Sequence, residues 1–464
     1  MPYSAGRAGT WQHARRLGHV PVVENQIVRE RLANYRIRAT EGSFQLPDNL
    51  LVSASLLDGP SELPRWAMSF DGSQSEVAVR EEYPGTRIGY VQIAGVLVHL
   101  EEMLSQATEH LVDPYVVRHA SDEALYSIVV PSSNVARSDM SSLRDSWRAE
   151  VFEILQTYTV EDSTLLDVFI RLVEHSDKRS PSGGIILARC PASESCTGRD
   201  IDVPASAGYC PSCGGQVFPT DSLRIHEEVA EEQSNLTALG RLMSFLEHLT
   251  MVGYLQFLLR RQPRSLANVA FIMDGPLALF GPQAWLHAAI QSLIDSLFHE
   301  LQSQSLGKPI IVGLEKTGQF AEHAAAIADR IQPQTIMLLP DQYIYDHILA
   351  SRPSSASQFG RDTYYGQKFF YRTEQGHLLT LTTPRPPGLA GAWHEPSNYQ
   401  VLSATLRLLD TIGTNLYTDA VIPIALAHSY ASIPLKTGSR VLTLLSRQLL
   451  GLSQDQPSHQ TGDS

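Results

Sequence analysis

Two aspartates stand in the same local context, and both could take part in metal chemistry. Asp71 follows the apolar run 65–70 (RWAMSF), and Asp274 follows the run 268–273 (NVAFIM). A glycine comes next in each case, and glycine lets the backbone approach a ligand closely. Asp-Gly is also a common turn dipeptide, so a simple turn explains either aspartate taken alone. Carboxylates from two strands are, however, the hard oxygen ligands that Mg²⁺ or Mn²⁺ needs to bridge a phosphodiester and activate water.

The four cysteines of the chain form a second candidate site. They are arranged as Cys190-x5-Cys196 and Cys210-x2-Cys213, and two glycines follow the second pair. Four thiolates in paired turns suit a tetrahedral structural Zn²⁺, although the first spacing is longer than the usual gap of about two to four residues. Since all four lie within 24 residues, zinc is favoured over free thiols or a secreted disulfide framework. We predict a zinc-ribbon-like module, and its contact with DNA, a partner protein or a dimer mate stays open.

The elements around the aspartates alternate between strand and helix. The run 65–70 and the run 87–98 (RIGYVQIAGVLV) flank Pro84 and Gly85, which predicts a β-hairpin whose first strand ends at Asp71. The runs 268–274 and 309–316 (PIIVGLEK) are each followed by a helical pattern. This alternation indicates βαβ units and a mixed or parallel sheet, so the chain is predicted to be α/β.

Helical spacing of apolar residues predicts the flanking layers. Two amphipathic helices are expected within 138–175, and further helices at 222–261, 285–301 and 397–417. The segments 368–372 and 377–382 alternate and are expected to be edge strands. The predicted division, in order, is an N-terminal arm and helix (1–60), the first part of the catalytic domain (61–180), the four-cysteine insertion (181–221), the second part of the catalytic domain (222–452) and a disordered tail (453–464).

The order of these motifs resembles the NurA nuclease family. The resemblance rests on Asp-Gly-Ser at 71–73, a long helix with a glutamate, Asp-Gly-Pro-Leu at 274–277, Lys-Thr at 316–317 and Ala-His at 427–428. It covers roughly residues 65–110 and 235–450 and leaves out the amino-terminal arm and the cysteine insertion. It implies an RNase H-like core with a mixed sheet, manganese-dependent cleavage of DNA, a homodimer, and association with a hexameric HerA-type ATPase that feeds DNA to the nuclease.

The resemblance also implies roles for individual carboxylates. Asp71 and Asp274 would bind the metal, and Glu247, in the stretch RLMSFLEHL, is the best match to the acidic helix residue of the family. Glu231 and Glu232 are alternatives for that third carboxylate.

Two further residues receive roles from the same resemblance. His428 would either bind the metal or move a proton, and Lys316 would neutralise a scissile phosphate. Without the resemblance, a hydrogen-bonded core histidine and a solvated lysine would explain both positions.

These residues lead to a functional hypothesis with two rivals. Water activated by one or two Mn²⁺ or Mg²⁺ ions on Asp71, Glu247, Asp274 and His428 would attack a DNA phosphodiester, in DNA end processing or in defence against phage. The main rival is a catalytically silent NurA-like subunit that serves as an assembly platform for the ATPase. A zinc-ribbon adaptor that binds DNA without enzyme activity is the third possibility.

The composition of the chain limits the ways in which it can bind DNA and the compartment in which it is expected. With 464 residues and a formal net charge of -13, it does not have the basic character of a protein that coats nucleic acid. Any DNA contact must be a local basic groove or be supplied by a partner. The amino terminus lacks the apolar run of a signal peptide, no uninterrupted apolar stretch of about 18 residues is present, and there is no P-loop. We therefore predict a cytoplasmic protein with no membrane contact that does not itself use ATP.

Overall fold

The computed structural model divides the chain into two compact units. One comprises Met1–Gln45 and Asp341–Ala356, and the other comprises Leu46–Pro340 and Ser357–Ser464. Residues 20–35, 44–59, 62–80, 82–105, 121–349, 358–388, 393–413, 421–433 and 437–450 are described. The tail predicted to be disordered, 453–464, lies outside the described residues. All candidate site residues belong to the larger unit.

The smaller unit consists of short helices. α1 (Val20–Glu24) and α2 (Gln26–Ala33) lie in the predicted amino-terminal arm, and α10 (Asp341–Tyr343) continues into a π-helical turn, η8 (Ile344–Ile348). Asn25 caps α2 by accepting a hydrogen bond from the amide of Ile27. Ile27 and Leu32, whose spacing predicted this helix, are both exposed, so α2 has no buried apolar face among the described residues.

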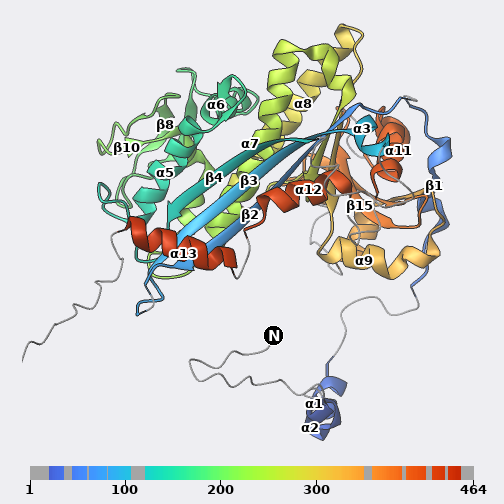
Figure 1. Ribbon diagram of the computed structural model, residues 1–464, viewed down its shortest axis with the longest axis horizontal. Coiled ribbons are helices and arrows are strands. Elements are labelled where there is room, and N and C mark those ends of the chain that lie inside the picture. Colours follow the sequence, from blue (N-terminus) through green and yellow to red (C-terminus); the bar gives the residue numbers. More distant parts are fainter. Residues whose placement is uncertain are drawn as a thin grey trace, which may run out of the picture. The chain divides into compact units, whose positions relative to one another are not determined.

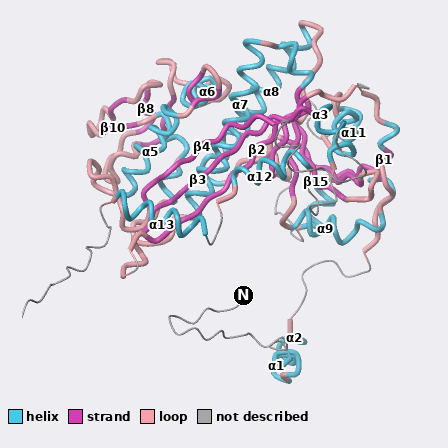
Figure 2. The backbone as a smooth tube through the Cα atoms, in the orientation of Figure 1, coloured by secondary structure: helices cyan, strands magenta, loops and turns pink. Residues whose placement is uncertain are grey.

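The larger unit is built on a nine-stranded mixed sheet (Figures 1 and 2). Its strands are β1 (Leu51–Ser53), β2 (Trp66–Ala78), β3 (Arg87–His99), β4 (Ser121–Pro131), β11 (Val269–Asp274), β12 (Ile310–Glu315), β13 (Thr335–Leu338), β14 (Gly366–Arg372) and β15 (Leu378–Pro384). Their order across the sheet is β1-β13-β14-β15-β12-β11-β2-β3-β4. β2, β11 and β12 run parallel, and every other neighbouring pair is antiparallel. The predicted α/β class with a mixed sheet is therefore confirmed.

The hairpin of β2 and β3 forms as predicted, but its first strand does not end at Asp71. Pairing continues from Asp71, opposite Ala94, to Ala78, opposite Arg87. The Asp-Gly pair is not a turn here because the seven residues of β2 that follow Asp71 continue to pair with β3. On the other side of β2, pairing with β11 stops at Phe70. Asp71 therefore lies in the middle of its own strand and beside the carboxyl end of the neighbouring one.

The strands β14 and β15 are interior strands, so the prediction that they form edges is wrong. β13 and β12 flank them, and the sheet edges are β1 and β4. Six of the seven residues of β15 are buried. The alternation of apolar and polar residues in the sequence suggests a strand with one exposed face. In β15, however, the polar threonines are buried next to the adjacent strands.

Helices cover both faces of the part of the sheet that contains β2. α7 (Leu236–Arg261) packs on β2 and β3 from one side, where the rings of Tyr254 and Phe70 lie 6.2 Å apart between centroids. α12 (Ile422–Ala431) packs from the other side, where Ser69 donates a hydrogen bond to the carbonyl of Pro423. Successive residues of a strand point to opposite faces, so Ser69 and Asp71 face α12 whereas Phe70 and Gly72 face α7. Figure 1 shows α12 in front of these strands and α7 behind them.

The remaining helices complete the layers. They are α3 (Leu100–Ser105), α5 (Leu143–Thr157), α6 (Leu165–Val173), α8 (Leu286–Ser303), α9 (Gln319–Ile327), α11 (Leu402–Ile412) and α13 (Thr437–Leu449). α5 and α6 are the two amphipathic helices predicted within 138–175. α11 is shorter than the predicted helix 397–417, and residues 414–420 lie outside the described part of the chain.

The helix predicted from residue 222 begins only at Leu236. Residues 219–228 form two short 3-10 turns, η3 (Pro219–Leu223) and η4 (Ile225–Glu228). Arg224, between them, has a φ of 57°, and this left-handed conformation cannot continue a right-handed helix. α7 has the length and apolar composition of a membrane span, but 67% of its most apolar 18-residue window is buried inside the protein, which accounts for its apolar character.

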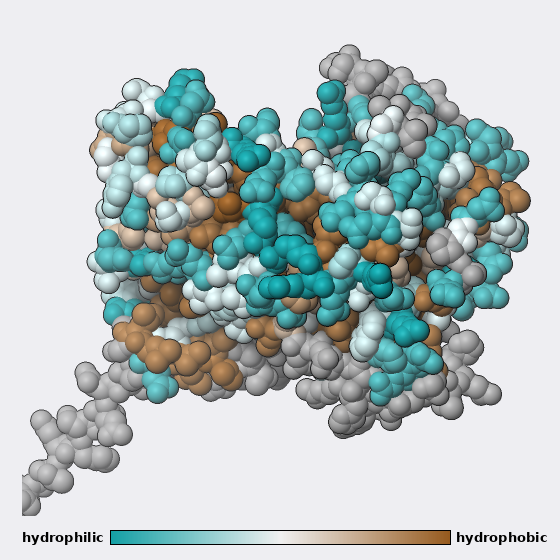
Figure 3. Space-filling model, turned by 90° about the horizontal axis from the view of Figure 1, so that it is seen from above, coloured by the Kyte–Doolittle hydropathy of each residue, from teal (hydrophilic) through white to brown (hydrophobic). Residues whose placement is uncertain are grey.

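α13 leaves apolar side chains outside the core. Val441, Leu444, Leu445 and Leu449 are all exposed. In Figure 3, brown apolar surface is gathered on the left, which is the side where Figure 1 places α13. The core of the described residues is instead formed between the sheet and helices α5 to α8.

Candidate metal centre

Asp71, Asp274 and His428 come together from three separate elements. β2 and β11 are parallel and pair as far as Phe70 and Met273, so the next residue of each strand, an aspartate in both cases, lies side by side with the other. α12 brings His428 to the same place, and its Nδ1 lies 2.8 Å from Oδ2 of Asp71. The possible ligand atoms of the three residues all lie within 4.8 Å of one another.

This geometry suits a small divalent cation. Two oxygen ligands on opposite sides of a Mg²⁺ ion, each at about 2.1 Å, are about 4.2 Å apart, and Mn²⁺ takes similar carboxylate and imidazole ligands. The separations of up to 4.8 Å exceed this value by an amount that side-chain rotation can close. Two carboxylates and one imidazole therefore form a donor set that could hold the ion.

Glu247 lies next to this group on the opposite face of the sheet but is not one of the three residues whose ligand atoms lie within 4.8 Å of one another. It lies on α7, is 6% exposed, and the charges of Asp71 and Asp274 both act on it. It can approach because Gly72 has no side chain: a Cβ there would lie 2.7 Å from Oε1 of Glu247. The amide of Gly72 also donates a hydrogen bond to Oδ1 of Asp71 at 2.8 Å and stabilises the Glu247 carboxylate. The glycine noted in the sequence as a point of close approach thus admits a third carboxylate.

The carboxylates of this cluster repel one another. Burial raises the pKa of Glu247 well above its usual value, and the charges of Asp71 and Asp274 raise it further. Burial and the charge of Asp274 also raise the pKa of Asp71, while the hydrogen bond from His428 opposes that shift. A bound cation would offset this repulsion, which is a second indication that the donor set suits a metal.

Lys316 lies beside the cluster at the end of β12. Its Nζ donates a hydrogen bond to Oδ2 of Asp274 at 2.8 Å. Asp274 ends β11 and Lys316 follows β12, and these two parallel strands pair as far as Asp274 and Leu314. The two side chains are therefore close together. One positive charge is therefore held next to the carboxylates, where it can meet an incoming anion.

The two alternatives to Glu247 are not part of this cluster. The carboxylate of Glu231 accepts hydrogen bonds at 3.1 Å from the amide of Leu143 at the start of α5, so it caps that helix. Glu232 is exposed and, like Glu231, precedes the first residue of α7. Neither carboxylate therefore occupies the position of Glu247 on that helix.

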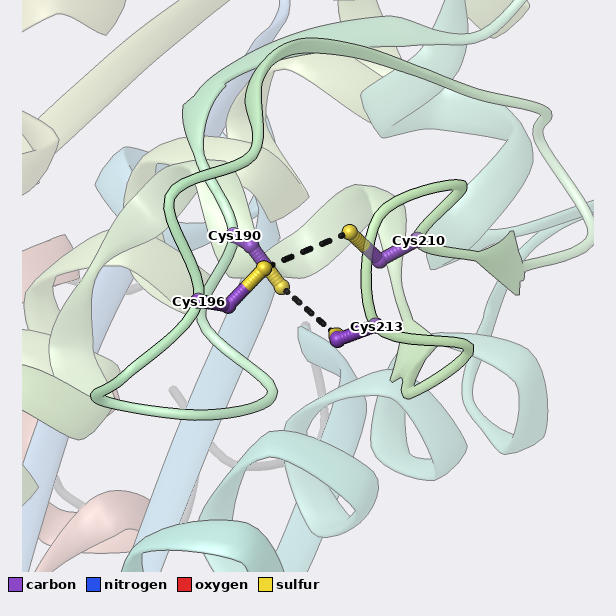
Figure 4. A group of neighbouring side chains, drawn as sticks. All are labelled: Cys190, Cys196, Cys210 and Cys213. Atoms are coloured by element: carbon purple, nitrogen blue, oxygen red, sulfur yellow. Dashed lines mark hydrogen bonds between the residues drawn. The ribbon is translucent and has the colours of Figure 1, made fainter.

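The four cysteines form a compact cluster of their own (Figure 4). Sγ of Cys190 lies 3.7 Å from that of Cys213, and Sγ of Cys196 lies 3.7 Å from that of Cys210. These separations are too long for a disulfide, whose sulfurs lie about 2.0 Å apart. They match the edge of a tetrahedron around Zn²⁺, which is about 3.8 Å for a Zn–S bond of about 2.3 Å. The thiols could therefore hold zinc with little rearrangement.

Short strands present these cysteines. Cys190 follows β7 (Ile185–Arg189), which pairs with β8 (Arg199–Val203), and the second pair lies between β9 (Gly208–Tyr209) and β10 (Gln216–Val217). Burial acts to raise the pKa of Cys210, but hydrogen bonds from the amides of Cys213 and Ser212, together with those from the thiols of Cys190 and Cys196, outweigh it and lower that pKa to about 6. The amides of the turn thus stabilise a thiolate, the form that binds zinc.

A buried ion pair attaches the cysteine module to α5. Arg148 donates two hydrogen bonds of 2.8 Å to the carboxylate of Asp221, one from Nε and one from Nη2. Nη2 also donates to the carbonyl of Gln216 in β10. Both members of the pair are buried, so the orientation of the module on α5 depends on this contact.

Comparisons with known proteins give little support for a family assignment. Neither the family models nor the curated protein sequences match the chain. Among solved structures, one described as "Crystal structure of NurA" is 13% identical, with a TM-score of 0.26, and covers 95% of this chain and 96% of that chain. At that TM-score the likeness carries no argument for a shared fold or activity.

Proposed function

We propose that the chain is a metal-dependent nuclease that hydrolyses DNA phosphodiester bonds. The observation that carries the proposal is the convergence of Asp71, Asp274 and His428, with their ligand atoms within 4.8 Å of one another. Buried Glu247 and the cation of Lys316 adjoin them. DNA as the substrate comes from the motif resemblance to the NurA family.

We assign the strands β4, β3, β2, β11 and β12 to the RNase H-like core expected from that resemblance. Three antiparallel strands followed by two strands parallel to β2 support this assignment. In such a sheet, residues beside the carboxyl ends of neighbouring parallel strands form the site. Asp71 and Asp274 occupy that place.

Each residue of the site would have a separate role in hydrolysis. Asp71, Asp274 and Glu247 would hold Mn²⁺ or Mg²⁺, which when bound supplies charge neutralisation and a more acidic water for phosphodiester hydrolysis. His428 has a side chain that is 64% exposed, so it can complete the ligand set or move a proton at the surface where substrate arrives. Lys316 would exchange its contact with Asp274 for a phosphate oxygen of the scissile bond.

The partners in this proposal are DNA, a HerA-type hexameric ATPase and a second copy of the chain. A net charge of -13 repels DNA at long range, which is consistent with delivery by a motor. The four-cysteine module would hold a structural Zn²⁺.

The test is a cleavage assay on linear double- and single-stranded DNA with Mn²⁺, with and without the candidate ATPase. The variants Asp71→Ala and Asp274→Ala should abolish cleavage, whereas Glu232→Gln, which changes an exposed carboxylate outside the cluster, should keep it. Intact DNA under every condition, with the ATPase still bound, would instead support the silent assembly platform.

A further inference from the structure

A cavity of about 730 Å³ opens beside the cysteine cluster, and no part of the proposed catalytic mechanism uses it. β7 and Cys190 form one wall, η3 and η4 form another, and the start of α5 closes it. Its volume falls within the range of small-molecule sites, which is about 300 to 1,000 Å³.

A buried histidine lines this cavity, and one of its ring nitrogens has no hydrogen-bond partner among the described residues. His226 is 5% exposed, and no described residue bonds its Nε2. Nε of Arg144, another lining residue, is also buried with no partner among the described residues. Burying a polar group without a hydrogen bond is unfavourable, so groups of this kind indicate where a ligand would supply the missing bonds.

The walls of the cavity carry four cationic side chains: Arg144, Lys178, Arg189 and Arg224. Arg144 pairs with Glu194, and Arg224 pairs with Glu227 three residues later in the chain. These pairs are solvent-exposed, and such pairs contribute little to stability, so a phosphate can replace the carboxylates. The third carboxylate of the wall, Asp221, is already neutralised by Arg148.

The cavity also offers an apolar wall and a neutral hydrogen-bonding group. Ile186, Leu187 and Pro191 line the side next to the cysteines. Burial lowers the pKa of His226 to about 4, so its ring is neutral near pH 7 and can donate or accept one hydrogen bond. A cationic rim, an apolar wall and one neutral polar group together suit a molecule with a phosphate and a heteroaromatic ring.

We propose that this cavity binds a nucleotide whose phosphate is held by Arg144, Arg189 and Arg224. The base would lie against the apolar wall, with a hydrogen bond to His226. The nucleotide is either free or the terminal nucleotide of a DNA strand, because both present the same phosphate and base.

The test measures binding by isothermal titration calorimetry on the purified full chain without added Mn²⁺ or Mg²⁺. The probes are dAMP, inorganic phosphate, and one oligodeoxynucleotide with either a 5′-phosphate or a 5′-hydroxyl group. We expect dAMP to bind at least tenfold more tightly than phosphate. Tighter binding of the phosphorylated strand than of dAMP would identify the strand end as the source, and equal or weaker binding would identify the free nucleotide.

Arg189→Ala is the test variant, and Arg199→Ala is its matched control. The two arginines are opposite each other in the pairing of β7 and β8 and both are exposed, but only Arg189 lines the cavity. Arg189→Ala should weaken dAMP binding at least tenfold, and Arg199→Ala should leave it within twofold. The proposal is overturned if dAMP fails to bind at millimolar concentration, if phosphate binds equally well, or if the two variants behave alike. No cleavage step enters the measurement, so its failure is distinct from a failure of the proposed nuclease activity.

Discussion

At the scale of single residues, the site depends on a carboxylate of α7 and a glycine of β2 that meet on one face of the sheet. Glu247 is buried beside two other carboxylates, and Gly72 provides both the space and an amide for it. The folded protein holds these carboxylates close together although their negative charges repel one another. Replacing one of these carboxylates by a neutral side chain should therefore lower function but raise stability.

The first prediction concerns Glu247→Gln. The raised pKa of Glu247 means that the folded state binds this proton more tightly than the unfolded state, so the stabilisation is present at low pH and is lost as pH rises above about 4.5. Without metal at pH 8, Glu247→Gln should raise the free energy of unfolding, because the neutral amide removes the charge repulsion while keeping the shape of the side chain. Nuclease activity should fall at least 100-fold.

Urea denaturation at pH 5 and pH 8 measures this effect, with Mn²⁺ as the control. The increase in the free energy of unfolding caused by Glu247→Gln should be smaller at pH 5 than at pH 8. The stability difference between variant and wild type should also become smaller when Mn²⁺ is added to the wild-type protein. A variant that is less stable than the wild type at pH 8 without metal would contradict the proposed repulsion.

The second prediction concerns Gly72→Ala. The new Cβ would lie 2.7 Å from both Oε1 of Glu247 and Cγ of Met243, so the substitution should cost about 1–3 kcal/mol of stability and displace the carboxylate. Gly95, opposite Phe70 in β3, is the matched control because its Cβ would come no closer than 3.5 Å to any side chain. Gly95→Ala should keep kcat within about twofold, and equal kcat values for the two variants would count against a role for Gly72.

At the scale of elements, the length of strand β2 determines where the residues of the metal site lie. One buried ion pair determines how the cysteine module is oriented. β2 continues beyond the end of β11, and at this point His428 of α12 contacts Asp71 while Glu247 of α7 lies beside Gly72 on the opposite face of the sheet. α5 supplies the contact that orients the cysteine module through Arg148.

The third prediction tests that contact by Arg148→Ala. Removing one partner leaves the charge of Asp221 buried and unpaired, which costs about 3–5 kcal/mol. Arg144→Ala, four residues earlier on the same helix, breaks only an exposed pair with Glu194 and should cost about 1 kcal/mol at most. Hydrogen exchange should show loss of protection in β7 to β10 for Arg148→Ala alone, and unchanged protection there would refute the anchoring role.

At the scale of the whole molecule, the larger unit combines two sites that use different ligand chemistry. Carboxylates and an imidazole form the first, and four thiols form the second. Hard oxygen ligands favour Mn²⁺ or Mg²⁺, and thiolates favour Zn²⁺. The two sites should therefore be filled independently.

The fourth prediction is that the purified chain carries one zinc ion bound by the cysteines. Elemental analysis should give one Zn²⁺ per chain, and Cys210→Ser should remove it and lower the melting temperature. Ser212→Ala, which keeps the backbone amide near Cys210, should retain zinc. Mn²⁺-dependent cleavage by Cys210→Ser at a temperature where it is folded should persist, and loss of cleavage there would assign zinc more than a structural role.

Local features of the sequence were enough to predict part of this architecture. The alternation of strand and helix patterns indicated the α/β class, and two Asp-Gly pairs after apolar runs indicated Asp71 and Asp274. The cysteine cluster was also visible, because its ligands lie close together in the chain. Glu247, His428 and Lys316 were named only through the motif resemblance, since a glutamate on a helix or a lysine after a strand has many ordinary explanations.

Tertiary structure alone decided how far β2 extends, where β14 and β15 lie, and which residues meet. His428 and Asp71 are separated by 357 positions in the chain, and no local pattern encodes their contact. The span of β2 depends on the register with β3, and the burial of β14 and β15 depends on the strands beside them. Both are set by pairing between distant segments, whereas sequence periodicity reports only on the nearest turn or strand.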